Sequence, residues 1–305
     1  MPARAKRAGF VSLIGRPNAG KSTLLNRVVG TKLAIVSDKP QTTRNRIVGV
    51  KNLGGDTPGQ LVFVDTPGIH RPLHRMNVRM VDAALETIRE VHVLVVVLDA
   101  SVETGAGDRF VLGVIERAAV PVVIALNKID LMAKPRLLPI IDWYHTQREW
   151  AAIVPVSART GDGCDRLVSV VLDSLPEGEA LYPDDYLTDQ PERVLVAEAV
   201  REKLLQYTHA ELPFSTAVVV DRFEEPGNRE MIRAYCSILV ERESQKAIVI
   251  GQRGALIKRI GTEARRDLEG FFAVQVYLDL HVRVRAGWRE DDRILDQLGL
   301  AHRLR

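Results

Sequence analysis

From residue 8 to residue 176, short apolar runs alternate with segments whose apolar residues recur at helical spacing. The runs predict buried strands at 10–14, 61–65, 93–98, 122–125 and 153–155. The mixed segments, which separate most of these runs, predict helices near 21–29, 79–90, 107–118, 136–148 and 164–174. Strands that alternate with helices indicate an α/β fold, in which a mostly parallel sheet is covered by helices on both faces.

One stretch departs from this alternation. Residues 44–66, RNRIVGVKNLGGDTPGQLVFVDT, contain two strand-like runs joined by a Gly/Pro turn, with no helical segment between them. Two strands joined directly by a turn run antiparallel. We therefore expect one antiparallel edge strand in the otherwise parallel sheet.

The pattern changes after Pro176. The stretch PEGEALYPDDYLTDQPER is rich in proline and acidic residues and has no hydrophobic period, which indicates a linker. Beyond it, the patterns predict the order α-β-β-α-α-β for an α+β domain. The segment before Gly251 is a helix by its place in this order, although its apolar run is also interpreted as a strand that precedes the GxxG loop. The predicted divisions are a first domain at 8–176, a linker at 177–190, a second domain at 191–292 and a tail at 293–305.

Composition and charge limit the class of protein. The chain has 305 residues, 46% of them hydrophobic and 27% charged, with a formal net charge of only +3, so any nucleic-acid surface must come from local clustering. Cys164 and Cys236 fit no metal-binding or disulfide spacing and are expected to be reduced. No signal peptide and no run long enough to span a bilayer is found, which predicts a cytoplasmic protein and leaves peripheral membrane contact open.

The most specific motif is GRPNAGKST at the end of the first predicted strand. Gly15, Gly20, Lys21 and Ser22 match the phosphate-loop pattern, in which glycines let backbone N–H groups surround phosphate oxygens at a helix N-terminus. The lysine would reach the β- and γ-phosphates and the serine hydroxyl would bind Mg²⁺. The predicted phosphate-binding residues are Gly15, Arg16, Pro17, Asn18, Ala19, Gly20, Lys21, Ser22 and Thr23.

Two further motifs identify the nucleotide. DTPG comprises Asp65, Thr66, Pro67 and Gly68 and ends a predicted strand, where the aspartate can hold Mg²⁺ through water and the Gly68 N–H can meet a γ-phosphate.

The motif NKID closes the predicted strand at 122–125 and would supply the contacts to the base. Asp130 can accept two N–H donors from guanine, which adenine does not offer, while Lys128 lies along the base and Asn127 ties this loop to the phosphate loop. Ser157 and Ala158, in the stretch VSA, would bring a backbone N–H near the base oxygen. Together the motifs predict GTP and GDP as ligands.

This ordered set of motifs resembles the translation-factor-like GTPases over residues 8–176. In that class a switch threonine completes the Mg²⁺ shell, and here Thr43 is the candidate, with Thr42 as the alternative. The glutamine that orients water in many GTPases is replaced by Ile69, with His70 as an alternative general base. GTPases that have an asparagine at the position of Asn18 and lack this glutamine often bind K⁺ there, where it takes the place of an arginine finger. We therefore expect slow intrinsic hydrolysis when K⁺ is absent. The predicted catalytic residues are Lys21, Thr43, Gly68 and Asn18, and the predicted Mg²⁺ ligands are Ser22, Thr43 and Asp65.

The second domain carries a motif for RNA. Gly251, Gln252, Arg253 and Gly254 form a GxxG loop, the feature by which KH domains clamp the backbone of about four nucleotides. A dense basic cluster surrounds it, as phosphate binding requires. The predicted RNA-binding residues are Gly251, Gln252, Arg253, Gly254, Lys258, Arg259 and Arg283.

From about residue 8 to residue 292 the chain resembles the bacterial Era GTPases, which join an amino-terminal GTPase domain to a type II KH domain. The resemblance rests on GRPNAGKSTLLN, QTTR, DTPG, NKID, VSA, IVIGQRG, IGTEARRDLEGFF and LDLHVRVRAGWRED, in that order. It implies binding near the 3′ end of 16S rRNA, a role in 30S subunit assembly and rRNA maturation, and some peripheral membrane association. We also expect the chain to be a monomer. The alternatives are an RNA-binding scaffold with a purely structural nucleotide and a metabolic ATPase, and the second is disfavoured by NKID and by the basic GxxG domain.

Overall fold

The computed structural model describes residues 6–39, 42–55, 58–69, 74–210, 212–225 and 231–300. The chain forms two compact units. The first holds all six strands of one sheet. The second holds everything described from Gln190 onward, together with residues 35–39, Thr42 and residues 74–79.

The first unit is built on a six-stranded sheet in the order β2-β3-β1-β4-β5-β6. Its strands are β1 (Arg7–Ile14), β2 (Ile47–Leu53), β3 (Gly59–Asp65), β4 (Val93–Asp99), β5 (Val122–Asn127) and β6 (Ala152–Pro155). Its helices are α1 (Lys21–Val29), α2 (Arg75–Glu90, in this unit from Met80 onward), α3 (Ala106–Val114), α4 (Leu137–Gln147) and α5 (Cys164–Asp173). The edge strand β2 pairs antiparallel with β3, and the other neighbours are parallel, which confirms the predicted fold class and the antiparallel edge.

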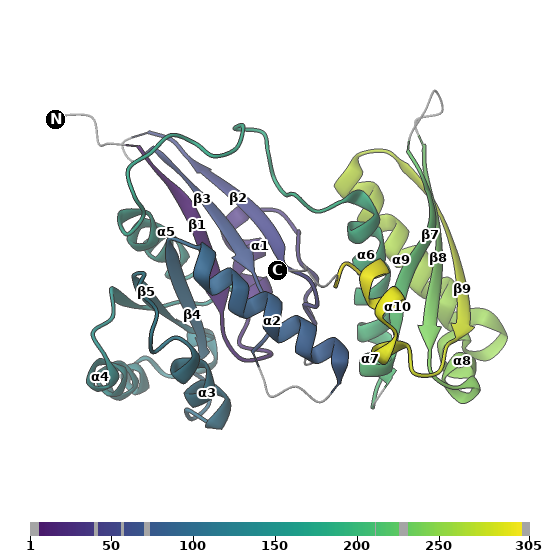
Figure 1. Ribbon diagram of the computed structural model, residues 1–305, viewed down its shortest axis with the longest axis horizontal. Coiled ribbons are helices and arrows are strands. Elements are labelled where there is room, and N and C mark those ends of the chain that lie inside the picture. The colour runs from purple at the N-terminus through teal and green to yellow at the C-terminus, as the bar shows by residue number, and fades with distance from the viewer. Residues whose placement is uncertain are drawn as a thin grey trace. The chain divides into compact units, whose positions relative to one another are not determined.

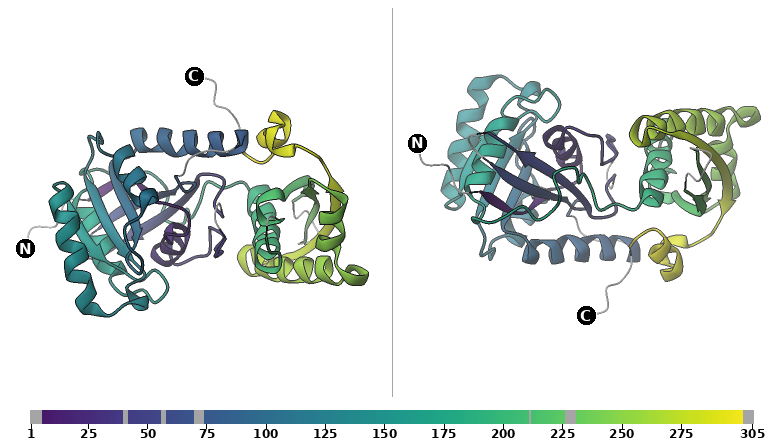
Figure 2. Two further views of the ribbon diagram at one scale, coloured as in Figure 1. Left: turned by 90° about the horizontal axis from the view of Figure 1, so that it is seen from below. Right: turned by 90° about the horizontal axis from the view of Figure 1, so that it is seen from above.

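The central strands are apolar on both sides because helices cover both faces of the sheet. β4 reads VLVVVLD and is buried along its first six residues. On one face it packs with residues of α2, α3 and α4. Both views of Figure 2 place α1 and α2 on opposite sides of the sheet. A parallel sheet with both faces covered leaves one edge free for ligands, at the carboxyl ends of its strands.

The second unit is a three-stranded sheet, in the order β7-β8-β9, with helices packed on it. Its elements are α6 (Glu192–Tyr207), α7 (Leu212–Ser215), β7 (Ala217–Glu224), β8 (Met231–Val240), α8 (Glu243–Ile250), α9 (Ala255–Phe272), β9 (Gln275–Val284) and α10 (Asp292–Gln297). β7 pairs antiparallel and β9 pairs parallel with the central strand β8. Figure 1 shows α6 and α9 side by side along the three strands. The predicted KH domain is confirmed by this topology together with the comparisons reported below.

The structure decides between two interpretations of one run. The run before Gly251 is the helix α8, as the predicted order requires, and not a strand, so the GxxG loop lies between two helices. Consecutive β-branched residues in AIVI suggested a strand, but only Val249 of α8 joins the core cluster, and Ile248 is exposed. The side chain of Gln245 accepts hydrogen bonds from the backbone N–H groups of Glu241 and Arg242, which starts the helix.

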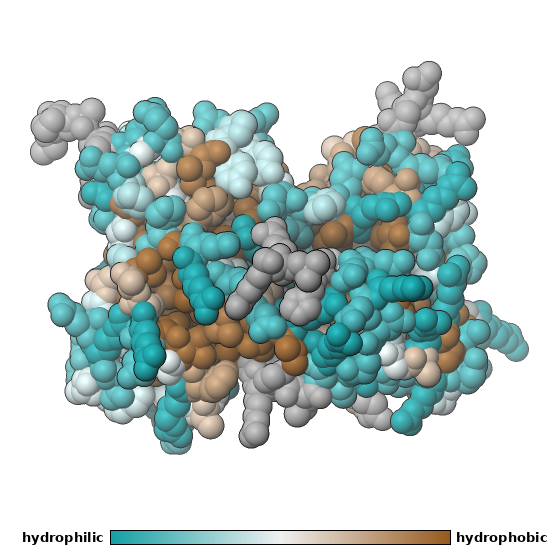
Figure 3. Space-filling model, in the orientation of Figure 1, coloured by the Kyte–Doolittle hydropathy of each residue, from teal (hydrophilic) through white to brown (hydrophobic). Residues whose placement is uncertain are grey.

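The distribution of hydrophobic side chains on the surface can be seen in one view. Figure 3 shows hydrophobic side chains gathered over α2 in this view and a mainly hydrophilic surface on the second unit. Among the described residues, no helix is both long enough and apolar enough to cross a membrane.

Candidate functional site

The phosphate loop follows β1 and leads directly into α1. Gly20 is the residue before this helix and has φ 95°, a conformation that side chains rarely adopt. A Cβ at this position would lie 2.2 Å from Nδ2 of Asn127. Only glycine therefore fits between α1 and the carboxyl end of β5. Lys21 begins α1, and its Nζ atom donates to the carbonyl oxygens of Gly15 and Arg16 at 3.3 Å each.

Three side chains from three different elements meet beside this loop. The Oγ atom of Ser22 donates to Oδ2 of Asp65 at 2.6 Å and lies 2.7 Å from Oγ1 of Thr43. Oγ1 of Thr43 in turn donates to the same carboxylate oxygen at 3.3 Å. These are the three residues that the sequence predicted as Mg²⁺ ligands. The alternative, Thr42, donates instead to the carbonyl oxygen of Lys39 at 2.6 Å.

Electrostatics distinguish this cluster from an ordinary polar core. Burial raises the pKa of the Asp65 carboxyl, against the opposing effects of Lys21 and of hydrogen bonds from Ser22, Thr43 and Thr66. Burial also lowers the pKa of Lys21, and the charge of Asp65 counteracts this in part. The second carboxylate oxygen of Asp65, Oδ1, is buried and has no hydrogen-bond partner among the described residues. Hydroxyl and carboxylate oxygens with an unused buried acceptor suit Mg²⁺, which prefers such ligands.

The base-binding motif lies at the carboxyl ends of β5 and β6. Asn127 is buried, donates from Nδ2 to the Ala19 carbonyl and accepts at Oδ1 from the Ala158 N–H, both at 2.9 Å. It therefore connects the phosphate loop with the stretch VSA. Oδ1 of Asp130 accepts a hydrogen bond from Oγ of Ser157 at 2.7 Å. Its other oxygen, Oδ2, lies 2.9 Å from Arg159, whose side chain is 73% exposed and can move away.

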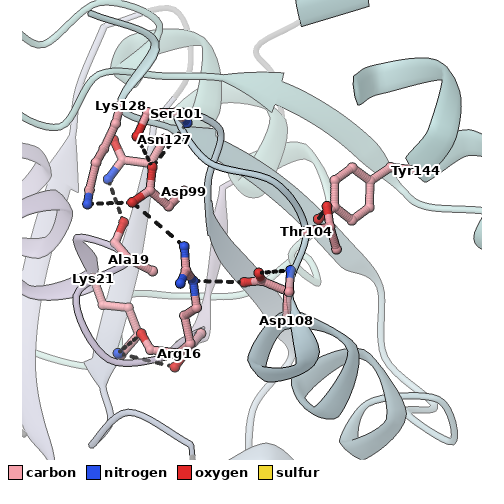
Figure 4. Close-up of polar contacts among 12 residues, drawn as sticks. Arg16, Ala19, Lys21, Asp99, Ser101, Thr104, Asp108, Asn127, Lys128 and Tyr144 are labelled. Atoms are coloured by element: carbon pink, nitrogen blue, oxygen red, sulfur yellow. Dashed lines mark hydrogen bonds and ion pairs between the residues drawn. The ribbon is translucent and has the colours of Figure 1, made fainter. Parts of the chain in front are cut away.

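A charged network that the sequence did not predict joins the two halves of the site. Asp99 ends β4, and its carboxylate lies 2.6 Å from Nζ of Lys128 and 3.8 Å from the guanidinium of Arg16. The same guanidinium lies 3.1 Å from Asp108 on α3. Figure 4 shows Asp99 between the lysine and the arginine, with Asp108 on the other side of the arginine. Burial opposes the charged form of Asp99, but hydrogen bonds from Lys128 and Ser101 outweigh it and lower its pKa.

One signal in the sequence could have identified Asp99. An aspartate at the carboxyl end of a predicted parallel strand lies at the edge where Asp65 and Asn127 also lie. Its partners, Arg16 and Lys128, could not have been identified in this way, because they are far from Asp99 in the sequence.

The position after Gly68 cannot orient water directly. Ile69 is 1% exposed and packs in the core with Ile14 and Leu94. Its N–H donates to the Gly15 carbonyl at 3.3 Å, so this segment lies against the phosphate loop. His70, the alternative general base, lies outside the described residues.

The GxxG loop of the second unit has a constrained backbone. Gly251 adopts φ 72° and ψ 176°, and a Cβ there would lie 2.7 Å from the Cβ atom of Leu256. Arg253 has φ 52°, and Gly254 has φ 77° and precedes α9.

The predicted RNA-binding side chains lie on α9 and β9. Arg259, on α9, lies 4.1 Å from the ring centroid of Tyr207, and its Nε atom donates to Glu263 at 3.1 Å. Arg283, on β9, lies 3.7 Å from Asp221. Lys258 belongs to α9, next to Arg259.

Comparison with known proteins agrees with this geometry. The model of the family described as 50S ribosome-binding GTPase matches residues 10–128, and the KH domain model matches residues 211–289. GTPase Era of Geotalea uraniireducens is 50% identical over 96% of this chain and 97% of its own length. GTPase Era of Geobacter metallireducens is 48% identical over the same shares.

Two solved structures cover almost the whole chain. An Aquifex aeolicus Era variant bound to GDP and AlF4⁻ superposes with a TM-score of 0.92 at 39% identity, over 97% of this chain and all of the other. An Era complex with MgGDPNP and nucleotides 1506–1542 of 16S ribosomal RNA gives a TM-score of 0.93 at 39% identity over the same shares.

The fold and the two motif-bearing regions define a P-loop GTPase joined to a KH domain. The chain belongs to the Era family of GTPases. It is an enzyme that hydrolyses GTP to GDP and phosphate, and its cofactors are a guanine nucleotide and Mg²⁺.

Proposed function

We propose that the chain binds 16S rRNA near its 3′ end through the KH domain and uses GTP hydrolysis to control this binding during 30S assembly and rRNA maturation. The observation that carries the proposal is the presence in one chain of the Ser22–Thr43–Asp65 cluster and the α8–GxxG–α9 unit. The relative bound to nucleotides 1506–1542 supports the identity of the RNA.

In the proposed switch, the protein contacts GTP at the guanine base and at the phosphates. The proposed nucleotide-binding residues are those predicted from the phosphate loop, DTPG, NKID and VSA. Asp130 accepts the N1 and 2-amino donors of guanine once Arg159 moves away, while Ser22, Thr43 and Asp65 hold Mg²⁺, which neutralises phosphate charge. Thr43 and Gly68 respond to the γ-phosphate. Loss of that phosphate on hydrolysis releases their segments, as in other GTPases.

The proposed hydrolysis is slow without help because Ile69 replaces the water-orienting glutamine. K⁺ near Asn18 would supply the charge that an arginine finger supplies elsewhere. We predict faster GTP turnover in K⁺ than in Na⁺ at equal ionic strength. Asn18→Gly should abolish this difference, since glycine keeps the φ of 63° but removes the side-chain oxygen. Equal turnover in both salts for the unmodified chain would exclude the K⁺ site.

On the RNA side, Gly251 and Gly254 let phosphates approach the backbone next to Gln252 and Arg253. Lys258, Arg259 and Arg283 add positive charge on neighbouring elements. The proposed domain boundaries are 8–176, 191–292 and a tail from 293, which begins inside α10.

The cellular state is also proposed: a monomer in the cytoplasm with a fraction on the inner face of the cell membrane. Cell fractionation and sedimentation of the purified chain would test both parts.

Crosslinking of the chain to 30S particles, followed by mapping of the crosslinked nucleotides, tests the proposed function. We expect crosslinks from α8 and α9 near the 3′ end of 16S rRNA, and fewer with GDP than with a GTP analogue. Crosslinks confined to another region of the rRNA, or the same yield in both nucleotide states, would contradict the proposal. The Gln252→Asp/Arg253→Asp variant is the control for crosslinks that do not need the loop.

A further inference from the structure

The sheet of the second unit has one covered face and one open face. Ile232, Ala234 and Cys236 of β8 belong to the core cluster, packed against α6 and α9. Successive side chains of a strand point to opposite faces, so Arg233 and Tyr235 lie on the other face. We call this the outer face.

Four side chains on the outer face form a cluster, the tyrosine–arginine ladder, which consists of Arg222, Tyr235, Tyr277 and Arg233. The guanidinium of Arg222 lies 5.6 Å from the Tyr235 ring centroid, and that of Arg233 lies 5.8 Å from the Tyr277 centroid. The two rings are themselves 5.8 Å apart with their planes tilted by 58°.

The register of the sheet explains the cluster. Arg222 pairs with Tyr235 across β7 and β8, and Arg233 pairs with Tyr277 across β8 and β9. The register shifts between Val220 and Arg222, which brings Arg222 onto the outer face. The ladder thus crosses all three strands.

Two of the four ladder side chains are well exposed, and the other two, Arg233 and Tyr235, are half-buried. Tyr277 is 46% exposed, and the side chain of Arg222 is 71% exposed. Exposed aromatic faces interleaved with guanidinium planes on an open sheet are the chemistry on which unpaired bases stack. The outer face of β9 carries Tyr277, Asp279, His281 and Arg283, so this strand lacks the apolar centre that a protein interface of standard size requires.

The ladder also lies along the strands that lead to the proposed clamp. Because α9 runs from the GxxG loop back to the start of β9, the loop lies toward the carboxyl ends of β8 and β9. Arg283 shares the outer face with Tyr277, six residues further along β9, which is about 20 Å at strand rise. RNA that passes the clamp could therefore follow β9 past Arg283 to the ladder.

We propose that the tyrosine–arginine ladder is a second RNA subsite, at which Tyr235 and Tyr277 stack bases of single-stranded RNA beyond the nucleotides held by the GxxG loop. This inference rests on the proposed function, since it concerns the same RNA. Arg233, and Arg222 in exchange for its ion pair with Glu224, hold the ring faces in place and contact the phosphates of the stacked bases.

The test is the affinity of Tyr235→Leu and Tyr277→Leu for RNA of decreasing length. The probe is a labelled RNA equivalent to nucleotides 1506–1542, shortened in steps from either end. On the full-length probe, each leucine variant should bind about 5- to 140-fold more weakly, which is the loss found when a stacking ring is removed. As the RNA is shortened, variant and unmodified affinities should converge, because the shortest RNA that still binds reaches only the clamp.

Tyr277→Phe and Tyr235→Phe are the matched controls. They keep the ring face and should bind the full-length probe as the unmodified chain does, whereas leucine keeps apolar volume on the strand without a π-face. Phe110→Leu, a change at a 47% exposed ring in the first unit, should also leave RNA affinity unchanged.

The outcomes separate this subsite from the proposed function. Normal affinity of both leucine variants for every probe overturns the subsite, while a loss in the GxxG double variant would leave the proposed function intact. Equal weakening on long and short RNA overturns the idea of a second subsite, because the ladder would then belong to the clamp. Loss of binding to 30S particles without loss of free-RNA affinity assigns the face to a protein partner and also overturns the inference. Failure of the unmodified chain to bind any of the probes would overturn both proposals.

Discussion

Asp130 and Ser157 show how single residues prepare the site for its base. The carboxylate of Asp130 is held by Ser157 on one oxygen and by the exposed side chain of Arg159 on the other. It is therefore oriented before the base arrives. A carboxylate fixed in this way can accept two guanine N–H groups, whereas adenine would leave it desolvated and unpaired.

This predicts the effect of Asp130→Asn. The amide offers one acceptor and one donor, so one of the paired N–H bonds is lost and GTP affinity should fall by about 1.5–3 kcal/mol, the value of a hydrogen bond to a charged group. Xanthine nucleotide, which carries an oxygen in place of the 2-amine, should gain affinity. Calorimetry with both nucleotides measures the exchange. Unchanged GTP affinity would remove NKID from the site.

Asp99 acts through its neighbours. Asp99→Asn should release Lys128 and loosen Arg16, and we expect about tenfold weaker GTP binding, or roughly 1.4 kcal/mol. Asp108→Asn is the matched control, because Asp108 contacts Arg16 but is not an ion-pair partner of Lys128. It should have the smaller effect. A larger loss of affinity in the control would show that Arg16, and not Lys128, transmits the contact.

The pH dependence of Asp99 follows from its depressed pKa. Its stabilising contribution is fully present above the unfolded value of about 3.9 and is lost as the pH falls through the lower folded value. The difference in unfolding free energy between the unmodified chain and Asp99→Asn should therefore shrink as the pH falls below about 4. A difference that stays constant down to the folded pKa would contradict the assignment.

At the residue scale, motif residues were predictable from the sequence because each is fixed by a local spacing. Lys21 and Ser22 lie a fixed distance from Gly15, and the turn after β1 brings all three together. Arg16, Asp99 and Asp108 were different. Arg16 was predicted only as part of the phosphate loop, and its two carboxylate partners come from β4 and α3, which only the folded sheet brings to it.

At the scale of elements, hydrophobic period predicted the strands of the first unit because they are buried on both faces and flanked by turns. The apolar run alone was misleading for α8, where four apolar residues in a row resemble a strand although only one residue of the helix joins the core cluster. The predicted order α-β-β-α-α-β had placed a helix there. Hydrophobic period also missed α10, whose six residues are too few to show a helical period. The short helix is instead started by Asp291, whose side chain accepts from the backbone N–H groups of Arg293 and Ile294.

The GxxG loop gives a prediction for one element. Gly251→Ala places a Cβ against Leu256 and forces alanine into a conformation that is essentially restricted to glycine, at a cost of about 1–3 kcal/mol from the backbone alone. Gly254→Ala is the matched control, since its backbone is left-handed but nothing lies within 4 Å of the added atom. Hydrogen exchange of β8 and β9 amides should show a larger loss of stability for Gly251→Ala. Equal losses would mean that the close approach to Leu256 relaxes without cost.

At the scale of the whole molecule, composition and hydrophobic pattern together predicted two parts. The acidic, proline-rich stretch after Pro176 separates two regions with different periods, and the chain indeed forms two units. The sequence could not predict that segments 35–39 and 74–79 group with the second unit, because this depends on contacts made across the chain.

Two units with separate motifs predict that RNA binding and nucleotide binding can be removed independently. Gln252→Asp/Arg253→Asp places two negative charges where a phosphate must approach the backbone, so RNA affinity should fall steeply while GTP affinity stays unchanged. For a single strand, the slope of log K against log salt should also become shallower by about 0.7 for every phosphate that the variant no longer binds. Arg283→Ala is the comparison: it removes one charge, already 3.7 Å from Asp221, and leaves the clamp glycines, so its loss should be smaller. RNA affinity at several salt concentrations, with GTP affinity as control, measures both. If the double variant binds RNA as the unmodified chain does, the GxxG loop is an ordinary turn between two helices, and the RNA must be held by another surface.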